Sequence, residues 1–189
     1  MKEITVYVDF KSPAAYLAIQ PTLSLARRTQ TQLVWQPLQT KQTSIPKQLP
    51  NEDRGATHRR VRAIARRDTH LLYARHQKLA MNFPDTYAET DLALAAMESI
   101  TSDRTTFVEA AFRSYWIEGA DLNDPATVKD VLNSCGQTSV PEPSDVQHIV
   151  QHIQARAVED GVIDAPGYVV GDQVFVGREH LPWIEEILT

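Results

Sequence analysis

Hydrophobic and polar positions alternate at the start of the chain and then change to a helical period. Residues 4–10 alternate and are rich in β-branched and aromatic side chains, which predicts a strand. Ser12-Pro13 predicts a helix start, with Ser as the N-cap and Pro in the first turn, and the helix is expected to end near residue 28. Residues 32–37 predict a second strand. The order strand, helix, strand favours a right-handed parallel crossover.

A long middle part of the chain has helical periodicity. It follows a polar loop over residues 38–55, which is long enough to carry function. Apolar positions at helical spacing predict helices over residues 58–79, 85–101, 104–118 and 125–136. The capping-box pattern from Ser144 to Gln147 predicts that a further helix begins there and ends near residue 159.

The last part of the chain returns to the strand period. Residues 168–170 and 173–176 flank Gly171-Asp172, which predicts a β-hairpin, and residues 179–188 predict a terminal helix. A four-stranded mixed sheet covered by helices would bury all of these apolar faces, so we expect an α/β fold. We divide the chain into a sheet domain, residues 1–40 and 145–189, and an all-helical insertion, residues 41–144.

Composition limits the chemistry. The chain has 189 residues, of which 42% are hydrophobic, and a single cysteine, Cys135. One cysteine cannot form an internal disulfide, a CxxC pair or a thiolate zinc cage, and we predict no metal site. No apolar run approaches the roughly 20 residues of a membrane helix. The first ten residues place acids where a signal peptide needs an apolar stretch, so we expect a cytoplasmic protein.

Charge is spread unevenly along the chain. The net charge is −5, which argues against general affinity for nucleic acid. Between Arg54 and Lys78, however, eight basic residues stand against one acid, Asp68. Most charge runs are solvated helix faces. The alternative is a cationic rim that attracts an anionic small molecule; nucleic acid is disfavoured because no aromatic residues are interleaved for stacking on bases.

Both ends of the chain resemble one branch of a known family. The run VDFKSPAAYLA at residues 8–18 resembles the opening of the 2-hydroxychromene-2-carboxylate isomerases and kappa-class glutathione transferases, and residues 161–181 resemble their C-terminal signature. These proteins belong to the DsbA-like families, so the resemblance implies a thioredoxin-like fold with a helical insertion. It also implies glutathione as the cofactor, a small anionic substrate, a homodimer and no membrane partner.

Ser12 is the candidate catalytic residue. At a helix N-terminus, free N–H groups and the helix dipole favour a thiolate. The chain has no cysteine there, so the thiol would come from glutathione and Ser12 would donate a hydrogen bond to its sulfur. The alternative is that Ser12 only caps the helix.

The resemblance also supplies candidate glutathione-binding residues. Pro166 is expected to be cis and to lie opposite Ser12, leaving the Ala165 backbone open to pair with the tripeptide as an added strand. Glu179 stands where the family carries an acid near the glutathione amino group. Lys41, in the long loop, is a candidate partner for a glutathione carboxylate.

Two function hypotheses follow. The first is a glutathione-dependent isomerase or transferase that acts on a small aromatic carboxylate. The second is a thioredoxin-fold binding module that has lost its chemistry. Three departures from the family pattern favour the second: Ala14 and Ala15 replace an aromatic residue and a hydroxyl, and Gly167 stands where the family carries threonine or serine.

Overall fold

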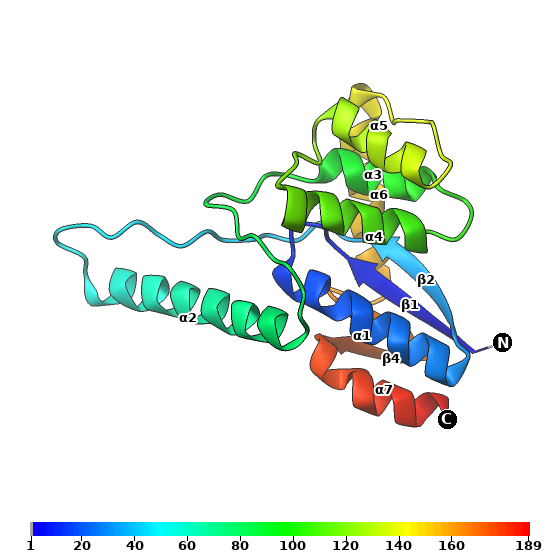
Figure 1. Cartoon of the computed structure of the whole chain (residues 1–189), viewed down its shortest axis with the longest axis horizontal. Coiled ribbons are helices and arrows are strands. Elements are labelled where there is room, and N and C mark those ends of the chain that lie inside the picture. Colours follow the sequence, from blue (N-terminus) through cyan, green and yellow to red (C-terminus); the bar gives the residue numbers. More distant parts are fainter. Residues whose placement is uncertain (1) are drawn as a thin grey trace.

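The computed structural model describes residues 2–189, and a four-stranded mixed sheet lies at its centre (Figure 1). The strands are β1 (Glu3–Val8), β2 (Gln32–Pro37), β3 (Gly167–Val170) and β4 (Gln173–Val176), in the order β2-β1-β3-β4. β1 pairs parallel with β2 and antiparallel with β3, and β3 pairs antiparallel with β4. The predicted α/β class, the parallel crossover and the hairpin at Gly171 are therefore confirmed.

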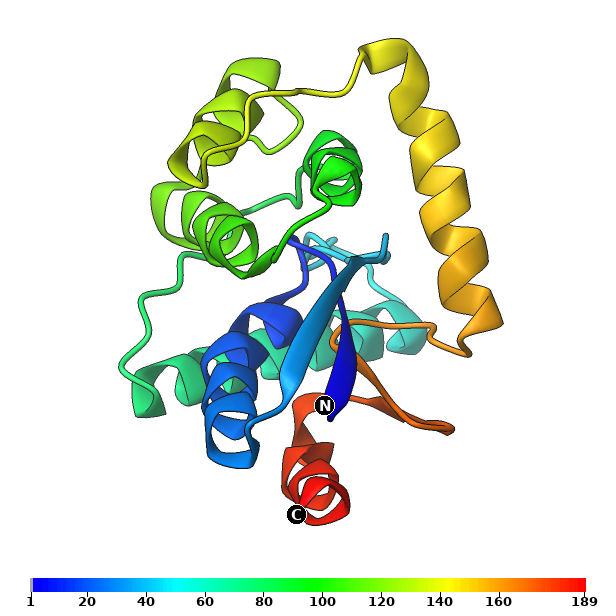
Figure 2. The same cartoon turned by 90° about the vertical axis from the view of Figure 1, so that its right-hand side faces the viewer.

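Helices cover both faces of this sheet (Figure 2). On one side α1 (Pro13–Thr29) contacts α7 (Leu181–Leu188), and Arg28 pairs with Glu185 at 2.7 Å. On the other side lies α6 (Pro143–Glu159), and Tyr7 of β1 donates a hydrogen bond of 2.6 Å to Asp160 at its end. Adjacent strand residues point to opposite faces, so the two helix layers use alternate side chains of the strands.

A block of shorter helices continues the core beyond the sheet. It consists of α3 (Asp91–Ser99), α4 (Thr105–Arg113), a π-helical turn (Ser114–Glu118) and α5 (Pro125–Ser134). The buried Trp116 joins this block to the sheet, because its indole nitrogen donates to the Phe10 carbonyl oxygen at 2.8 Å. The hydrophobic core is one cluster that includes residues of both parts.

Several predicted helix boundaries are wrong for local reasons. The helix predicted over residues 85–101 begins only at Asp91, because Phe83 and Tyr87 pack edge-on against Trp116 in a segment without regular secondary structure. The Ser144 capping box does not form, since α6 begins at Pro143 without a side-chain cap. A 3₁₀ turn (Arg178–His180) precedes α7, which therefore begins at residue 181.

The arginine-rich segment forms one long helix, α2 (Arg54–His76), which extends away from the rest of the molecule (Figure 1). It begins four residues earlier than predicted because the Asp53 side chain accepts a hydrogen bond of 2.6 Å from the Ala56 amide. The loop from Leu38 to Asp53 runs out beside it. No helix among residues 2–189 has the length and apolarity that crossing a membrane requires.

Candidate functional site

The N-terminus of α1 is built around Ser12. The residue has extended backbone angles, with φ −81° and ψ 115°, and its Oγ accepts a hydrogen bond of 3.2 Å from the Ala15 amide. The predicted N-cap is therefore confirmed. The same hydroxyl donates to the Ala165 carbonyl oxygen at 2.9 Å, and Ser12 is only 1% exposed.

The segment opposite Ser12 contains the predicted cis bond between Ala165 and Pro166. The Ala165 backbone, however, is not open as predicted. Its carbonyl accepts from Ser12, its amide donates to Asp164 Oδ1 at 2.8 Å, and the residue is buried. A tripeptide that pairs with Ala165 would have to replace these bonds, so that role stays a prediction.

Gly167 follows Pro166 for a steric reason. A Cβ at this position would overlap Val162 Cγ1 and lie 3.1 Å from the Asp164 carbonyl oxygen. The tight approach of residues 162–164 therefore requires glycine. The departure from the family pattern at this position follows from packing in this chain.

The buried side chain of Asp9 holds together the segments next to the Ser12 turn. Asp9 is fully buried and accepts hydrogen bonds of 2.7 Å from both the amide and the hydroxyl of Thr40, and one of 2.9 Å from Thr90. Its carbonyl oxygen accepts from the Ser12 amide at 3.0 Å. Burial raises the pKa of Asp9, although the Lys11 ammonium at 4.0 Å and these hydrogen bonds oppose the rise.

Asp9 thus ties together β1, the segment after β2 and the start of α3. No hydropathy pattern singles out this residue, because an acid directly after a strand is most simply a solvated turn residue. Its sequence signal is position alone, directly after β1 and three residues before the Ser12 cap.

Two cavities flank the N-terminus of α1. Pro13 lines a cavity of about 710 Å³ between the long loop and α2, and Ala14 lines one of about 260 Å³ between α2 and the turn after β4. Lys41 lines the larger cavity and Glu179 the smaller, so the structure brings both near α1, on different sides of its N-terminus. Ser12 itself lines neither cavity.

The backbone at this helix end has one free donor. Pro13 has no N–H, and the Ala15 amide is bonded to Ser12. Among the hydrogen bonds of residues 2–189, none uses the Ala14 amide, and Ala14 is partly exposed at the smaller cavity. An anion there would meet this N–H and the positive end of the α1 dipole.

His70 lies on α2 where the two cavities adjoin and lines both. Its ring stacks on Phe83 with centroids 6.2 Å apart, and the guanidinium of Arg178 lies over the Tyr73 ring at 4.0 Å. Burial and the nearby positive charges of Arg66 and Arg178 lower the pKa of His70 to about 4. The imidazole is therefore neutral at neutral pH and can accept a hydrogen bond.

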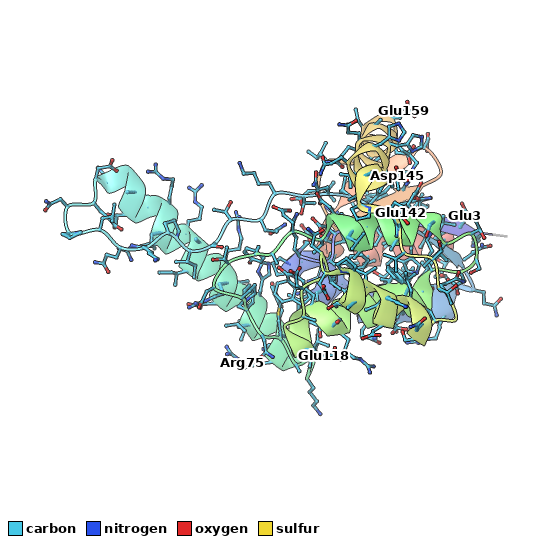
Figure 3. The ribbon with its side chains drawn as sticks, turned by 90° about the horizontal axis from the view of Figure 1, so that it is seen from above. Glu3, Arg75, Glu118, Glu142, Asp145 and Glu159 are labelled. Carbon is cyan, nitrogen blue, oxygen red and sulfur yellow. The ribbon has the colours of Figure 1, made fainter. Side chains whose placement is uncertain are left out.

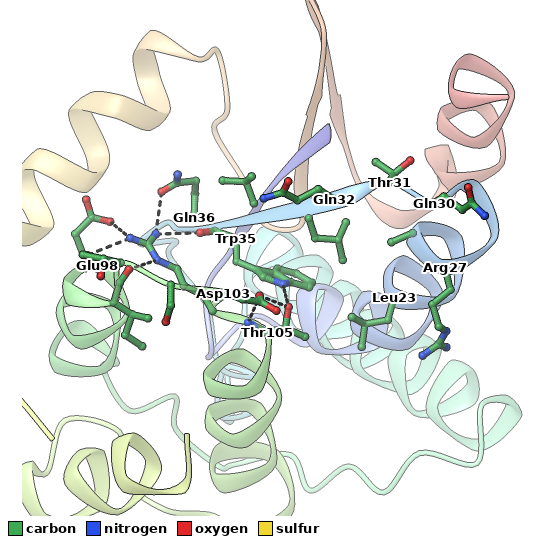
Figure 4. Close-up of a pocket in the computed structure, with 17 residues that line it drawn as sticks. Leu23, Arg27, Gln30, Thr31, Gln32, Trp35, Gln36, Glu98, Asp103 and Thr105 are labelled. Atoms are coloured by element: carbon green, nitrogen blue, oxygen red, sulfur yellow. Dashed lines mark hydrogen bonds and ion pairs between the residues drawn. The ribbon is translucent and has the colours of Figure 1, made fainter. Parts of the chain in front are cut away.

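A third cavity, of about 960 Å³, lies elsewhere, along the outer edge of β2 (Figure 4). Several of its polar groups already bond within the chain. Arg104 donates to the Trp35 carbonyl oxygen at 3.0 Å and to Gln36 at 3.2 Å, and its pKa is lowered chiefly by burial. Glu98 pairs with Arg156 at 2.5 Å. These groups hold the β2 edge to the helices.

Comparisons with known proteins agree with this geometry. The family model of the DSBA-like thioredoxin domain matches residues 3–189. The chain is 27% identical to a 2-hydroxychromene-2-carboxylate isomerase of Sphingobium xenophagum, over 99% of this chain and 98% of that protein.

Solved structures agree in fold. The structure of a 2-hydroxychromene-2-carboxylate isomerase superposes with a TM-score of 0.72 at 18% identity, covering 98% of this chain and 94% of that one. The cytosolic disulfide reductase DsbM from Pseudomonas aeruginosa with GSH superposes with a TM-score of 0.57 at 12% identity, covering 98% of both chains. With its mixed sheet, its cis-proline opposite the first helix and a family match over nearly its whole length, this chain belongs to the DSBA-like thioredoxin domain family.

Proposed function

We propose that this protein is a glutathione-dependent isomerase or transferase that acts on a small aromatic carboxylate. The observation that carries the proposal is the free Ala14 amide at the α1 N-terminus, beside Ser12 and next to a cavity lined by cations. The relative from Sphingobium xenophagum is named for an aromatic carboxylate, and a structure similar in fold was solved with GSH. Both names support the proposal for this chain.

Glutathione fits the donor groups at this helix end. The Ala14 N–H and the α1 dipole would hold a sulfur anion, and Ser12 would contribute by turning its hydroxyl away from Ala165. The chemistry that glutathione supplies when bound is reversible addition of its sulfur to a conjugated carbon, which permits rotation about the former double bond.

The chain would position the second reactant and its proton. The arginines of α2 would orient the substrate carboxylate, Lys41 in the same cavity would meet a glutathione carboxylate, and Glu179 would face the glutathione amino group. The neutral His70, which lines both cavities, would accept a hydrogen bond from a bound reactant there. A homodimer stays a prediction.

Ser12→Ala tests the proposal. We expect calorimetry to show a large loss of glutathione affinity, with the thiolate absorbance of bound glutathione shifted to higher pH. Ser24→Ala, on the same helix but far from its N-terminus, is the matched control and should bind like the wild type. Because Ser12→Ala also removes a cap, its fold is checked by circular dichroism. Unchanged affinity in a folded Ser12→Ala protein would refute the role of Ser12.

The second candidate function is a binding module without chemistry. It is favoured by the burial of Ser12 and by the bond that commits its hydroxyl to Ala165. A wild-type protein with no glutathione affinity that forms a stable complex with a protein from cell extract would select this function over the enzyme.

A further inference from the structure

One face of α2 is a row of cations directed at the larger cavity. Arg59, Arg62 and Arg66 stand at positions i, i+3 and i+7, the spacing of neighbours on a helix face, and all three line the cavity of about 710 Å³. The long loop supplies Lys41 and Lys47 to the facing wall. We call these five residues the cation row.

The cation row has no acidic partners, unlike its neighbours on the same helix. Arg60 pairs with Glu52 at 2.9 Å, and Arg67 pairs with Asp68 at 3.4 Å. Within residues 2–189, no ion pair joins a member of the cation row to an acid. Asp85 is the one acid among the described residues that line the cavity.

A group of acids lies on a distant part of the molecule. Figure 3 shows Glu142, Asp145 and Glu159 along α6, whereas α2 extends from the opposite side of the molecule. A cleft lined by charges of one sign concentrates counter-ions of the other sign. In a protein of net charge −5, this cleft therefore departs from the average surface.

The cavity also has a flat apolar part. Phe83 and His70 stack with an interplanar angle of 14°, and Tyr87 and Pro13 line the same cavity. A volume of about 710 Å³ is in the range of sites for small organic ligands. Stacked rings suit a planar, conjugated ligand. The cation row lies on two walls around this apolar part of the cavity.

We propose that this cleft binds a planar organic acid with at least two anionic groups, held by the cation row on facing walls. The inference rests on the proposed function and narrows its substrate class. One carboxylate makes a bidentate pair with one guanidinium, which would leave four cations of the row against a single acid of the lining, Asp85. A second anionic group on a rigid body reaches from α2 to the lysines of the loop.

Calorimetry without glutathione tests this with benzoate, benzene-1,3-dicarboxylate and benzene-1,3,5-tricarboxylate at one ionic strength. We expect the dicarboxylate to bind at least about tenfold more tightly than benzoate, which corresponds to about 1.4 kcal/mol, and the tricarboxylate to bind at least as tightly as the dicarboxylate. Arg62→Ala should lose about tenfold in dicarboxylate affinity. Arg75→Ala, the same change on α2 outside the cavity lining, should lose little.

Three results would overturn the inference. Equal affinity for benzoate and the dicarboxylate would show that the cleft does not select ligands by their number of anionic groups. Equal losses of dicarboxylate affinity in Arg62→Ala and Arg75→Ala would show that the ligand is attracted by the overall charge of α2 and not bound by the cation row. Tighter binding of a short single-stranded DNA than of the tricarboxylate would assign the row to nucleic acid.

Failure of this inference is distinct from failure of the glutathione proposal. Ser12→Ala should keep dicarboxylate binding, because Ser12 does not line the cavity. A wild-type protein that binds glutathione but does not prefer the dicarboxylate overturns only the inference drawn from the cation row.

Discussion

Two neighbouring regions at the start of α1 differ in whether their polar and charged groups have partners within the chain. Around Ser12 and Asp9, each buried polar group described above is matched by a partner within the chain. A few residues away, the cation row gathers five positive charges with no acid paired to them. Groups arranged against stability are typical of functional sites. The contrast suggests that the first region supports the fold and the second binds the ligand.

The largest expected effect comes from Asp9→Ala in the first region. The change removes the acceptor for Thr40 and Thr90 and leaves the buried Lys11 with only the exposed Glu89 as a partner. Breaking a buried charged network from one side costs about 3–5 kcal/mol. We expect that loss in the free energy of unfolding, measured by urea denaturation.

Asp68→Ala is the matched control for Asp9→Ala. Asp68 is exposed on α2 and pairs only with Arg67 at 3.4 Å, so its loss should cost less than about 0.5 kcal/mol. If Asp9→Ala stayed within about 1 kcal/mol of the wild type, the description of Asp9 as the support of the Ser12 turn would be wrong.

Gly167→Ala tests the packing of the same region. The added methyl group would overlap Val162, and overpacking of this kind costs about 1–3 kcal/mol. Thermal unfolding should show a clear fall in melting temperature. Gly55→Ala is the control, since its Cβ meets only the ends of two side chains and alanine favours a helix. A Gly167→Ala protein as stable as the Gly55→Ala control would contradict the proposed tight approach.

The fold follows from the sequence further than the site does. Alternation in residues 4–10 and the Gly171 turn reflect burial on one face of a sheet, which is a local property that hydropathy records. Ser12 could be predicted as a cap because Ser-Pro acts on its own helix. The bond from Ser12 to Ala165 spans 153 residues, and no local pattern predicts it.

The cation row lies between these two cases. Its helical spacing is visible in the sequence at Arg59, Arg62 and Arg66, but the sequence does not say that Lys41 and Lys47 lie opposite or that the acids pair elsewhere. The helix predicted from residue 85 begins only at Asp91, because the contacts of Phe83 and Tyr87 with Trp116 override the local preference.

The lowered pKa of His70 makes the free energy of unfolding depend on pH. Its pKa is about 6.5 in an unfolded chain and about 4 in the fold. Between these two pH values the unfolded chain binds a proton that the folded chain does not. The free energy of unfolding therefore falls as pH falls from 6.5 towards 4, and His70 does not affect it above pH 6.5. The ring is partly exposed, so we expect a loss of about 1 kcal/mol between about pH 7.5 and pH 5.

His70→Gln should remove this part of the pH dependence, measured by urea unfolding at both pH values. Because other groups titrate in the same range, the informative quantity is the difference between the two proteins. A variant whose stability falls with pH as steeply as that of the wild type would mean that burial and the charges of Arg66 and Arg178 do not lower the pKa of His70.

The smallest expected change in stability is a gain, in Arg62→Ala, whereas the substitutions around Ser12 and Asp9 are expected to cause losses. This difference in sign distinguishes the cation row from the region around Ser12 and Asp9. Arg62 stands three residues from Arg59 and four from Arg66, so Arg62→Ala removes two like-charge contacts, each worth about 0.2–0.5 kcal/mol. We expect the variant to be more stable than the wild type by a few tenths of a kcal/mol, with the gain shrinking as salt is added. Arg75→Ala should show no gain, since a cation in the last helical turn is favourable. A loss of stability in Arg62→Ala would mean that this arginine supports the fold, and the contrast between the two regions would then fail.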